Sequence, residues 1–216
     1  MVDEIGNIAK KIDHALLHPT LTDEQIVNGC ELAKAYRVAA VCVKPYSVAQ
    51  AVEVLKDSNV SVCTVVGFPH GNISIEMKLV EAEDSIKEGA TEIDVVVNVG
   101  KVMGGDWVYV EREIFEVNKL VVGKGAILKV IFETDYLDDV QVIKLCEISS
   151  RIGVAYVKTS TGFGFVKQEG GSYNYKGATD HFLRLMREHC PESISIKASG
   201  GIKTGADALR VIGLGV

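Results

Sequence analysis

The sequence lacks the cysteine pattern of a disulfide-stabilised or zinc-stabilised protein. Its five cysteines are an odd number, and no two of them form a Cys-x-x-Cys pair. Disulfide frameworks usually contain an even number of cysteines, and structural zinc sites usually contain such close pairs. We therefore expect free thiols, and a reducing, cytoplasmic setting for the protein.

Signals for membranes, secretion and nucleic acids are lacking as well. No uninterrupted apolar stretch is long enough to cross a bilayer. The segment MVDEIGNIAK has neither the basic part nor the apolar run of a signal peptide. The formal net charge is −6, so the chain has no general electrostatic attraction for nucleic acid or for an anionic membrane. An anionic substrate would need a local positive site.

Nothing in the sequence reads as a linker between domains. The 216 residues include no Pro-rich or Ser-rich segment and no low-complexity run. Apolar residues make up 47% of the chain and charged residues 24%, which is the balance of a globular domain. We therefore expect residues 1–216 to form a single domain with a well-buried core.

The chain alternates between short runs rich in Val and Ile and longer amphipathic stretches. The short runs predict seven strands, at 11–17, 38–45, 61–69, 91–99, 126–133, 154–160 and 193–199. The longer stretches predict helices at about 22–36, 47–57, 73–88, 106–122, 138–151, 178–190 and 204–213. Thr22, followed by Asp23 and Glu24, is typical of an N-cap with an acidic first turn. Strict alternation of strands and helices predicts a parallel sheet.

Two arrangements of a parallel sheet compete, an open doubly wound sheet and a (β/α)8 barrel. Central strands of a doubly wound sheet are apolar on both faces. Here the run 91–99 places Ile93, Val95 and Val97 on one face and Asp94 on the other. The same alternation occurs in the runs 38–45, 126–133, 154–160 and 193–199. A polar face needs a shared interior, which a barrel provides, so we predict an α/β protein with the (β/α)8 TIM-barrel fold.

The count of predicted strands is one short of eight. The chain stops at Val216, just after the last predicted helix, so the eighth strand–helix unit is missing from it. A barrel without that strand would have two unpaired edges. Either the barrel is atypical or the chain is C-terminally incomplete, and we expect the second.

Charged side chains fall on the polar faces of the predicted strands. The expected interior set is Asp13, Asp94, Lys129, Lys158 and Lys197, with Lys44 and Glu133 nearer the mouth. Buried charges are costly unless they are paired or used. The alternative is that these strands face the solvent and that their lysines pair there with surface carboxylates.

A group of lysines and aspartates is the set that amine catalysis needs. A lysine attacks a carbonyl only when it is unprotonated, and a second ammonium nearby, with partial desolvation, lowers its pKa. Lys158 and Lys197 lie on consecutive predicted strands at similar depth, so one could be the nucleophile and the other the charge that lowers its pKa. Asp94 could position a water molecule or relay protons.

Three segments resemble the motifs of deoxyribose-phosphate aldolases. They are EIDVVVN with Asp94, YVKTSTGF with Lys158, and IKASGGIK with Lys197. IDHALLHPT with Asp13 and AAVCVKP with Cys42 resemble the first two strands of that family, so the resemblance covers nearly the whole chain. It implies a class I aldolase in which Lys158 forms a Schiff base. Lys197 would tune this lysine and transfer protons, and Asp94 would join the relay.

The resemblance also implies a reaction. Its substrate would be 2-deoxy-D-ribose 5-phosphate, cleaved reversibly to D-glyceraldehyde 3-phosphate and acetaldehyde in deoxynucleoside breakdown. No cofactor and no metal are expected, because the imine is the electron sink. A homodimer is an expected assembly, since family members are often dimers. Two alternatives stay open, a related Schiff-base aldolase such as a transaldolase, and a barrel that binds a phosphorylated ligand without chemistry.

Further site residues are expected around this centre. Asp13, Cys42, Lys129 and Thr161 are candidates for contact with the substrate. Loops after late barrel strands often bind phosphate through backbone N–H groups, and glycine permits a close approach. Gly162, Gly200 and Gly201 are therefore candidates for phosphate binding, although such glycines also serve simply to turn the chain. The polar segment 164–180 could be a lid, and we expect it to be a surface loop.

Overall fold

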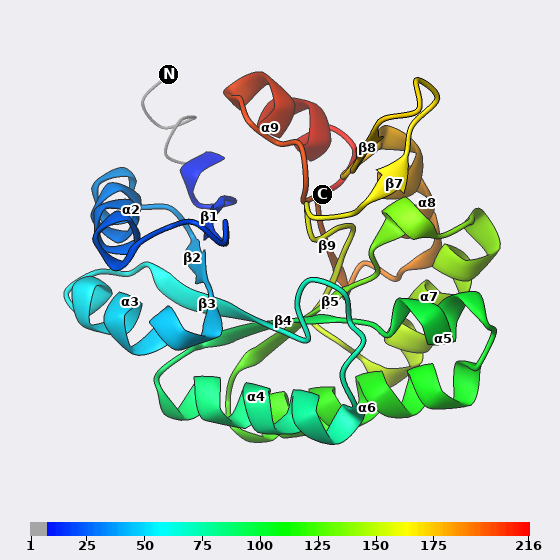
Figure 1. Cartoon of the computed structure of the whole chain (residues 1–216), viewed down its shortest axis with the longest axis horizontal. Coiled ribbons are helices and arrows are strands. Elements are labelled where there is room, and N and C mark those ends of the chain that lie inside the picture. Colours follow the sequence, from blue (N-terminus) through cyan, green and yellow to red (C-terminus); the bar gives the residue numbers. More distant parts are fainter. Residues whose placement is uncertain (1–7) are drawn as a thin grey trace.

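A computed structural model describes residues 8–216 of the chain (Figure 1). Seven strands form one parallel sheet in the order β1-β2-β3-β4-β5-β6-β9. Their bounds are β1 Asp13–Leu16, β2 Ala40–Val43, β3 Ser61–Val66, β4 Glu92–Val96, β5 Ile127–Ile131, β6 Tyr156–Lys158 and β9 Ser195–Lys197. Spatial order follows chain order and the sheet is strongly curled, which confirms the TIM-barrel architecture over a doubly wound sheet.

Helices cover the outer side of the curled sheet (Figure 1). They are α2 Asp23–Tyr36, α3 Val48–Leu55, α4 Ile75–Lys87, α6 Trp107–Gly123, α7 Asp139–Ile152, α8 Asp180–His189 and α9 Gly205–Ile212, each within a few residues of its predicted range. Thr22 caps α2 as expected, in a capping box with Gln25. Among residues 8–216, no helix combines the length and the apolar character that a membrane span requires.

Several short elements were not predicted. They are the helix α5 Val99–Met103, the 3-10 helices η1 Pro45–Ser47 and η2 Thr134–Tyr136, and the hairpin strands β7 Val166–Lys167 and β8 Tyr173–Asn174. The predicted strand 91–99 was too long. It ends at Val96 because the side chain of Asn98 accepts the N–H of Lys101 and caps α5.

Two apolar clusters fill the two sides of the sheet. The larger cluster lies between the sheet and the helices and contains Ile93, Val95 and Val97, as the alternation predicts. The smaller cluster lies on the inner side of the sheet and consists of Leu17, Ala40, Cys42, Cys63 and Val65, with Phe68 and Phe163 packed against it. Burying only one face of each strand under helices leaves the other face for an interior site.

In the described part of the chain, β1 and β9 are the two edges of the sheet. The edges approach each other without forming a ladder, and a cavity of about 730 Å³ lies between and behind them. Residues from both edges line it, including Asp13 from β1 and Lys197 from β9. The polar faces of both edge strands therefore line this cavity.

Candidate active site

Lys158, Asp94 and Lys129 meet on the inner side of the sheet. Lys158 is the last residue of β6, and Asp94 and Lys129 are register partners on β4 and β5. The Nζ of Lys158 lies 2.6 Å from Oδ2 of Asp94, and the Nζ of Lys129 lies 2.9 Å from Oδ1. The carboxylate of Asp94, which is completely buried, thus bridges two ammonium groups.

A second pair of acids extends this network to the edges of the sheet. Lys129 also contacts Glu92 at 2.5 Å and Asp13 at 3.5 Å, and Asp13 contacts the Nζ of Lys197 at 2.9 Å. The ion pairs therefore run in sequence from Lys197 through Asp13, Lys129 and Asp94 to Lys158. We call these five residues the ionic chain. They are the five interior charges that the alternation of the strands predicts.

The charges within the ionic chain stabilise one another. Burial disfavours an ionised Asp94, but the ammonium groups of Lys158 and Lys129 outweigh this effect and hold the pKa of Asp94 well below its usual value. Burial likewise favours a neutral Lys158, but the carboxylate of Asp94 outweighs it and raises the pKa of Lys158. Lys158 is thus a protonated amine with a hydrogen-bonded proton acceptor.

The structure corrects one expectation about this lysine. Lys158 and Lys197 are neighbours as predicted, because they are register partners on β6 and β9. However, a lowered pKa of Lys158 was expected from the charge of Lys197, and the pKa is raised instead. The reason is that Asp13 pairs with Lys197, whereas Asp94 lies directly against Lys158. Nucleophilic attack therefore requires transfer of a proton from Lys158, and Asp94 is the nearest acceptor.

The loop after β6 is held by a buried acid. Both the backbone N–H and the hydroxyl of Thr161 donate hydrogen bonds to the carboxylate of Glu133. Glu133 was expected near the mouth, and it is only 1% exposed, with a left-handed backbone at φ 57°. Burial raises its pKa to about 7. Thr161 therefore attaches the loop to Glu133, and its hydroxyl already has a hydrogen-bond partner within the protein.

The three predicted phosphate-binding glycines lie together. Gly162 follows β6, and Gly200 and Gly201 follow β9; all have positive φ, at 81°, 85° and 82°. A Cβ on Gly162 would lie 3.9 Å from the Cα of Gly200. Among residues 8–216, nothing accepts a hydrogen bond from the N–H groups of these glycines. They form a small surface of unused donors.

The cavity brings together most of the predicted site residues. Its lining includes Asp13, Cys42, Lys129, Lys158, Lys197 and Gly200, and it continues over Ser199, Lys203 and Thr204. Asp94 lies behind Lys158 and Lys129, and Thr161, Gly162 and Gly201 lie beside the lining. The segment 164–180 forms the β7–β8 hairpin on the surface, as expected, with the exposed rings of Phe165 and Tyr173 stacked.

Two residues of the interior were not singled out from the sequence. Glu92 pairs with Lys129, and the thiol of Cys63 donates to Oδ1 of Asp94 at 3.2 Å. Alternation along the strands places both on the inner face, Glu92 with Asp94 and Cys63 with Val65. The pattern was therefore present, but a cysteine in an apolar run suggests only packing.

Known proteins share both the sequence and the fold of this chain. The sequence model of the DeoC/LacD family aldolases matches residues 7–212. The chain is 48% identical to a deoxyribose-phosphate aldolase of Caldanaerobacter subterraneus, over 99% of this chain and 88% of that protein. It is 44% identical to a deoxyribose-phosphate aldolase of Rhodopirellula baltica, over 97% of this chain and 83% of that protein.

A solved structure agrees with these matches. The tetrameric deoxyribose phosphate aldolase of Aeropyrum pernix superposes with a TM-score of 0.86 at 33% identity, over 97% of this chain and 84% of that one. The family model and the relatives each cover nearly all of the chain, including every member of the ionic chain. The chain thus belongs to the DeoC/LacD family of aldolases, which are lyases.

Proposed function

We propose that the chain cleaves 2-deoxy-D-ribose 5-phosphate reversibly to D-glyceraldehyde 3-phosphate and acetaldehyde, through a Schiff base on Lys158. One observation carries this proposal: Lys158 faces the cavity while its Nζ lies 2.6 Å from the buried Asp94 carboxylate. An amine in contact with both a substrate and a proton acceptor can become a nucleophile. Membership of the aldolase family and the names of the relatives support the choice of substrate.

The proposed reaction uses the ionic chain to move protons. Lys158 gives a proton to Asp94, and its amine attacks C1 of the open-chain aldehyde. Loss of water leaves a protonated imine. A base then takes the proton of the C3 hydroxyl, the C2–C3 bond breaks, and its electrons pass to the imine, so that glyceraldehyde 3-phosphate leaves and an enamine remains. Protonation at C2 and hydrolysis release acetaldehyde and restore Lys158.

The second half of the relay is proposed for Lys197. It lies beside Lys158 on β9, lines the cavity and pairs with Asp13. An ammonium at this position can supply a proton to the carbinolamine hydroxyl or to C2 of the enamine. When Lys197 gives up this proton, Asp13 remains paired with Lys129, and Lys197 regains a proton before the next cycle.

The phosphate group of the substrate is proposed to bind at the glycine loops that follow β6 and β9. The unused N–H groups of Gly162, Gly200 and Gly201 suit an anion, and Lys203 and Thr204 continue the cavity wall. The donors follow β6 and β9, the strands that carry Lys158 and Lys197, so a phosphate held there would leave the rest of the substrate extended toward Lys158. Cys42 would contact the two-carbon end from the opposite wall.

Borohydride trapping tests the proposed function. The full chain is incubated with acetaldehyde or with deoxyribose 5-phosphate, reduced, and analysed by intact mass and peptide mapping. We expect one stable adduct on the peptide containing Lys158, and none in Lys158→Leu. Lys167→Leu, which alters an exposed lysine of the hairpin, is the matched control and keeps the adduct. A folded wild-type chain that gives no adduct would overturn the Schiff-base proposal.

We also propose a cytoplasmic location and a homodimeric assembly. The five cysteines are free and buried, which suits a reducing compartment. Exposed apolar side chains on α6, Val108 and Phe115, offer a surface for self-association, and the aldolase of A. pernix is a tetramer. Light scattering coupled to gel filtration should give twice the chain mass of 23.3 kDa, and a mass of one chain would contradict the dimer.

A further inference from the structure

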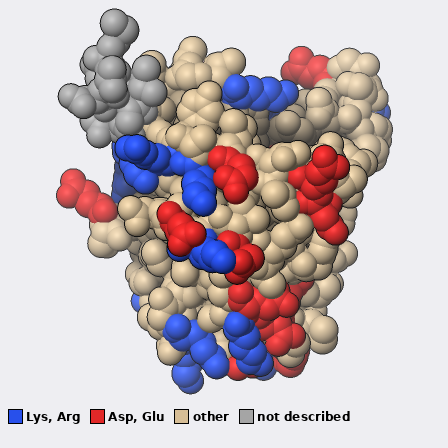
Figure 2. All heavy atoms as spheres, turned by 90° about the vertical axis from the view of Figure 1, so that its left-hand side faces the viewer, with Lys and Arg blue, Asp and Glu red and all other residues tan. Residues whose placement is uncertain are grey.

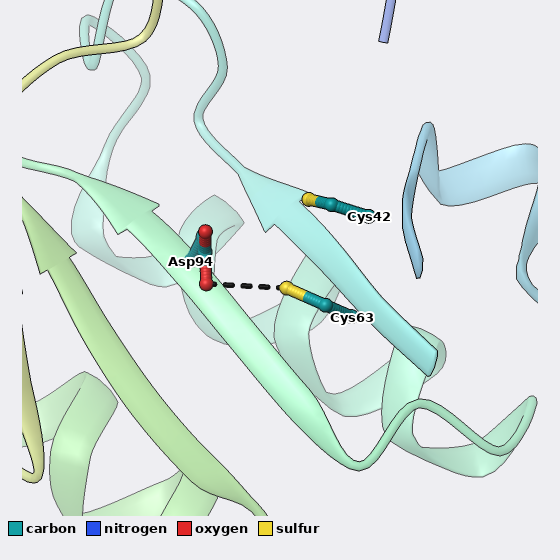
Figure 3. A group of neighbouring side chains, drawn as sticks. All are labelled: Cys42, Cys63 and Asp94. Carbon is teal, nitrogen blue, oxygen red and sulfur yellow. Dashed lines mark hydrogen bonds between the residues drawn. The ribbon is translucent and has the colours of Figure 1, made fainter. Parts of the chain in front are cut away.

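Two thiols and a carboxylate converge on the inner side of the sheet (Figure 3). Cys42 on β2 and Cys63 on β3 are register partners, and Asp94 lies on the next strand, β4. The two sulfur atoms and a carboxylate oxygen all lie within 4.8 Å of one another. Both sulfurs point toward the Asp94 carboxylate, and Cys63 donates its thiol proton to it.

The cluster is buried yet reachable. Cys63 and Asp94 are fully buried, whereas Cys42 lines the 730 Å³ cavity. An ion in the cavity would therefore meet Cys42 first, with Cys63 and Asp94 directly behind it. The surrounding Leu17 and Val65 are apolar, so an ion bound there would be shielded from water on the side away from the cavity, which strengthens its bonds to charged ligands.

A cation, the ammonium group of Lys129, already lies beside this cluster. The Nζ of Lys129 lies 3.3 Å from the sulfur of Cys63 and 2.9 Å from Oδ1 of Asp94. Glu92 and Asp13 also contact this ammonium and can hold it if it moves aside. The electrostatic environment thus accepts positive charge at the point where the three donor atoms meet.

We propose that Cys42, Cys63 and Asp94 bind one soft divalent cation of the Zn²⁺ and Cd²⁺ class, and that binding inhibits the enzyme. Thiolates select such ions, and one carboxylate completes a three-ligand site with a fourth position open to the cavity. Two sulfurs on one Zn²⁺ lie roughly 3.8 Å apart, from a Zn–S distance of about 2.3 Å. The thiols therefore need to approach by about 1 Å at most.

The charge balance explains why two thiols are needed. A thiol binds a metal as the thiolate, so a cation held by Cys42 and Cys63 displaces two protons. One divalent cation enters as two protons leave, and the formal charge of the site beside Lys129 and Lys158 is unchanged. A single thiol would leave an extra positive charge beside two ammonium groups.

Inhibition follows from the role of Asp94. Its oxygens accept from both Lys129 and Lys158, and a metal bond to one of them withdraws that oxygen from the ionic chain. Lys158 then has a weaker proton acceptor and forms its imine more slowly. The ion has no part in the Schiff-base reaction itself, which needs no metal.

Cadmium titration of the full chain, kept reduced with a phosphine, tests the binding site. We expect one Cd²⁺ per chain, a thiolate-to-cadmium absorption band, and release of about two protons. Cys63→Ala should weaken binding by about a hundredfold and reduce the band, while Cys30→Ala, a buried thiol of α2, should bind like the wild type. Equal binding by Cys63→Ala and wild type, or no stoichiometric band in the wild type, would overturn the proposal.

Borohydride trapping with and without zinc tests the inhibition. One equivalent of Zn²⁺ should suppress the Lys158 adduct at least about tenfold, and a chelator should restore it. In Cys63→Ala the ratio of trapping with and without zinc should stay near one. An equal suppression in both proteins would refute inhibition through this site. The cadmium measurements do not depend on aldolase activity, so their failure would leave the proposed function standing.

Discussion

Lys158 and Lys197 are register partners on neighbouring strands, yet each ammonium contacts a different carboxylate. Asp94 pairs with the first and Asp13 with the second, and Lys129 joins the two acids. Two like charges side by side would repel each other, and the alternating order of acids and lysines removes that cost. The same order provides a sequence of proton donors and acceptors that ends at the cavity.

Asp94→Asn should disable the proposed proton acceptor. We expect kcat/KM for deoxyribose 5-phosphate to fall by about a hundredfold or more. The carboxylate raises the pKa of Lys158, so its removal should lower that pKa and shift the pH dependence of imine trapping to lower pH. Asp84→Asn on the exposed side of α4 is the control and should leave both measurements unchanged. A pH profile of trapping that does not move would contradict the pairing of Lys158 with Asp94.

Gly201→Ala should weaken phosphate binding. Gly201 has φ 82°, and a Cβ there would meet only a backbone oxygen at 3.9 Å. Gly171→Ala, on the hairpin, is a matched control because φ is 80° and the space is open. Both variants should lose about 1–2 kcal/mol of stability from the left-handed backbone. Only Gly201→Ala should raise KM for deoxyribose 5-phosphate, by about tenfold, with a smaller effect on unphosphorylated deoxyribose.

Glu133 should give folding stability a specific pH dependence. Burial raises its pKa from 4.5 to about 7, so between these values the folded state binds a proton that the unfolded state does not. Its contribution to stability is therefore present at low pH and is lost as pH rises toward 7. Urea unfolding measures this as the loss in the free energy of unfolding between pH 5 and pH 8. That loss should be smaller in Glu133→Gln than in the wild type, by up to about 3 kcal/mol. A parallel decline in both proteins would rule out this role for Glu133.

A buried ion pair behind the sheet should be essential for stability. Lys78 on α4 is fully buried, with its Nζ 2.7 Å from Oε1 of Glu113 on α6 and 2.6 Å from the carbonyl of Val96. Lys78→Met would leave the buried Glu113 without its ammonium partner, at a cost of about 3–5 kcal/mol in the free energy of unfolding. Lys144→Met breaks an exposed pair on α7 and should cost less than about 0.5 kcal/mol. Similar losses from the two variants would contradict this assignment.

Much of the site could be predicted because strands alternate. Once β4 is placed with Val95 on the helix-packed face, Asp94 must face the interior, and the same argument places Lys129 and Lys158. The motifs around Lys158 and Lys197 then indicated the chemistry. These predictions needed only local periodicity and a resemblance over the whole chain.

Other features depend on how the strands are staggered, which local sequence does not reveal. Strand register and the curl of the sheet decide which carboxylate meets which ammonium. Asp13 was expected to pair with one of the lysines, but the choice of Lys197 and the raised pKa of Lys158 were not foreseen. The contact between Lys78 and Glu113 joins two helices 35 residues apart in sequence. The buried Glu133 has a left-handed backbone that a non-glycine residue rarely adopts, and local sequence does not indicate it.

The exposed charges on one face of the molecule do not alternate in a fixed order. On the face of the molecule that carries α2 and α3, Lys and Arg side chains are interspersed with Asp and Glu (Figure 2). This mixed surface agrees with the expectation that the chain has no broad attraction for nucleic acid. Neither sign of charge is thus concentrated on this face, whereas lysines and aspartates alternate in a fixed order along the ionic chain.

The contact between Asp13 and Lys197 also joins the two edges of the described sheet, β1 and β9. In the described part of the chain, no backbone ladder joins these two strands, and this side-chain ion pair is a contact between them. The backbone hydrogen bonds of a ladder do not change when a substrate is protonated, but this ion pair consists of groups that take part in the proposed relay. Each proton that passes through Lys197 would therefore weaken or restore its contact with Asp13, so the proposed relay and the contact between these two strands would be linked.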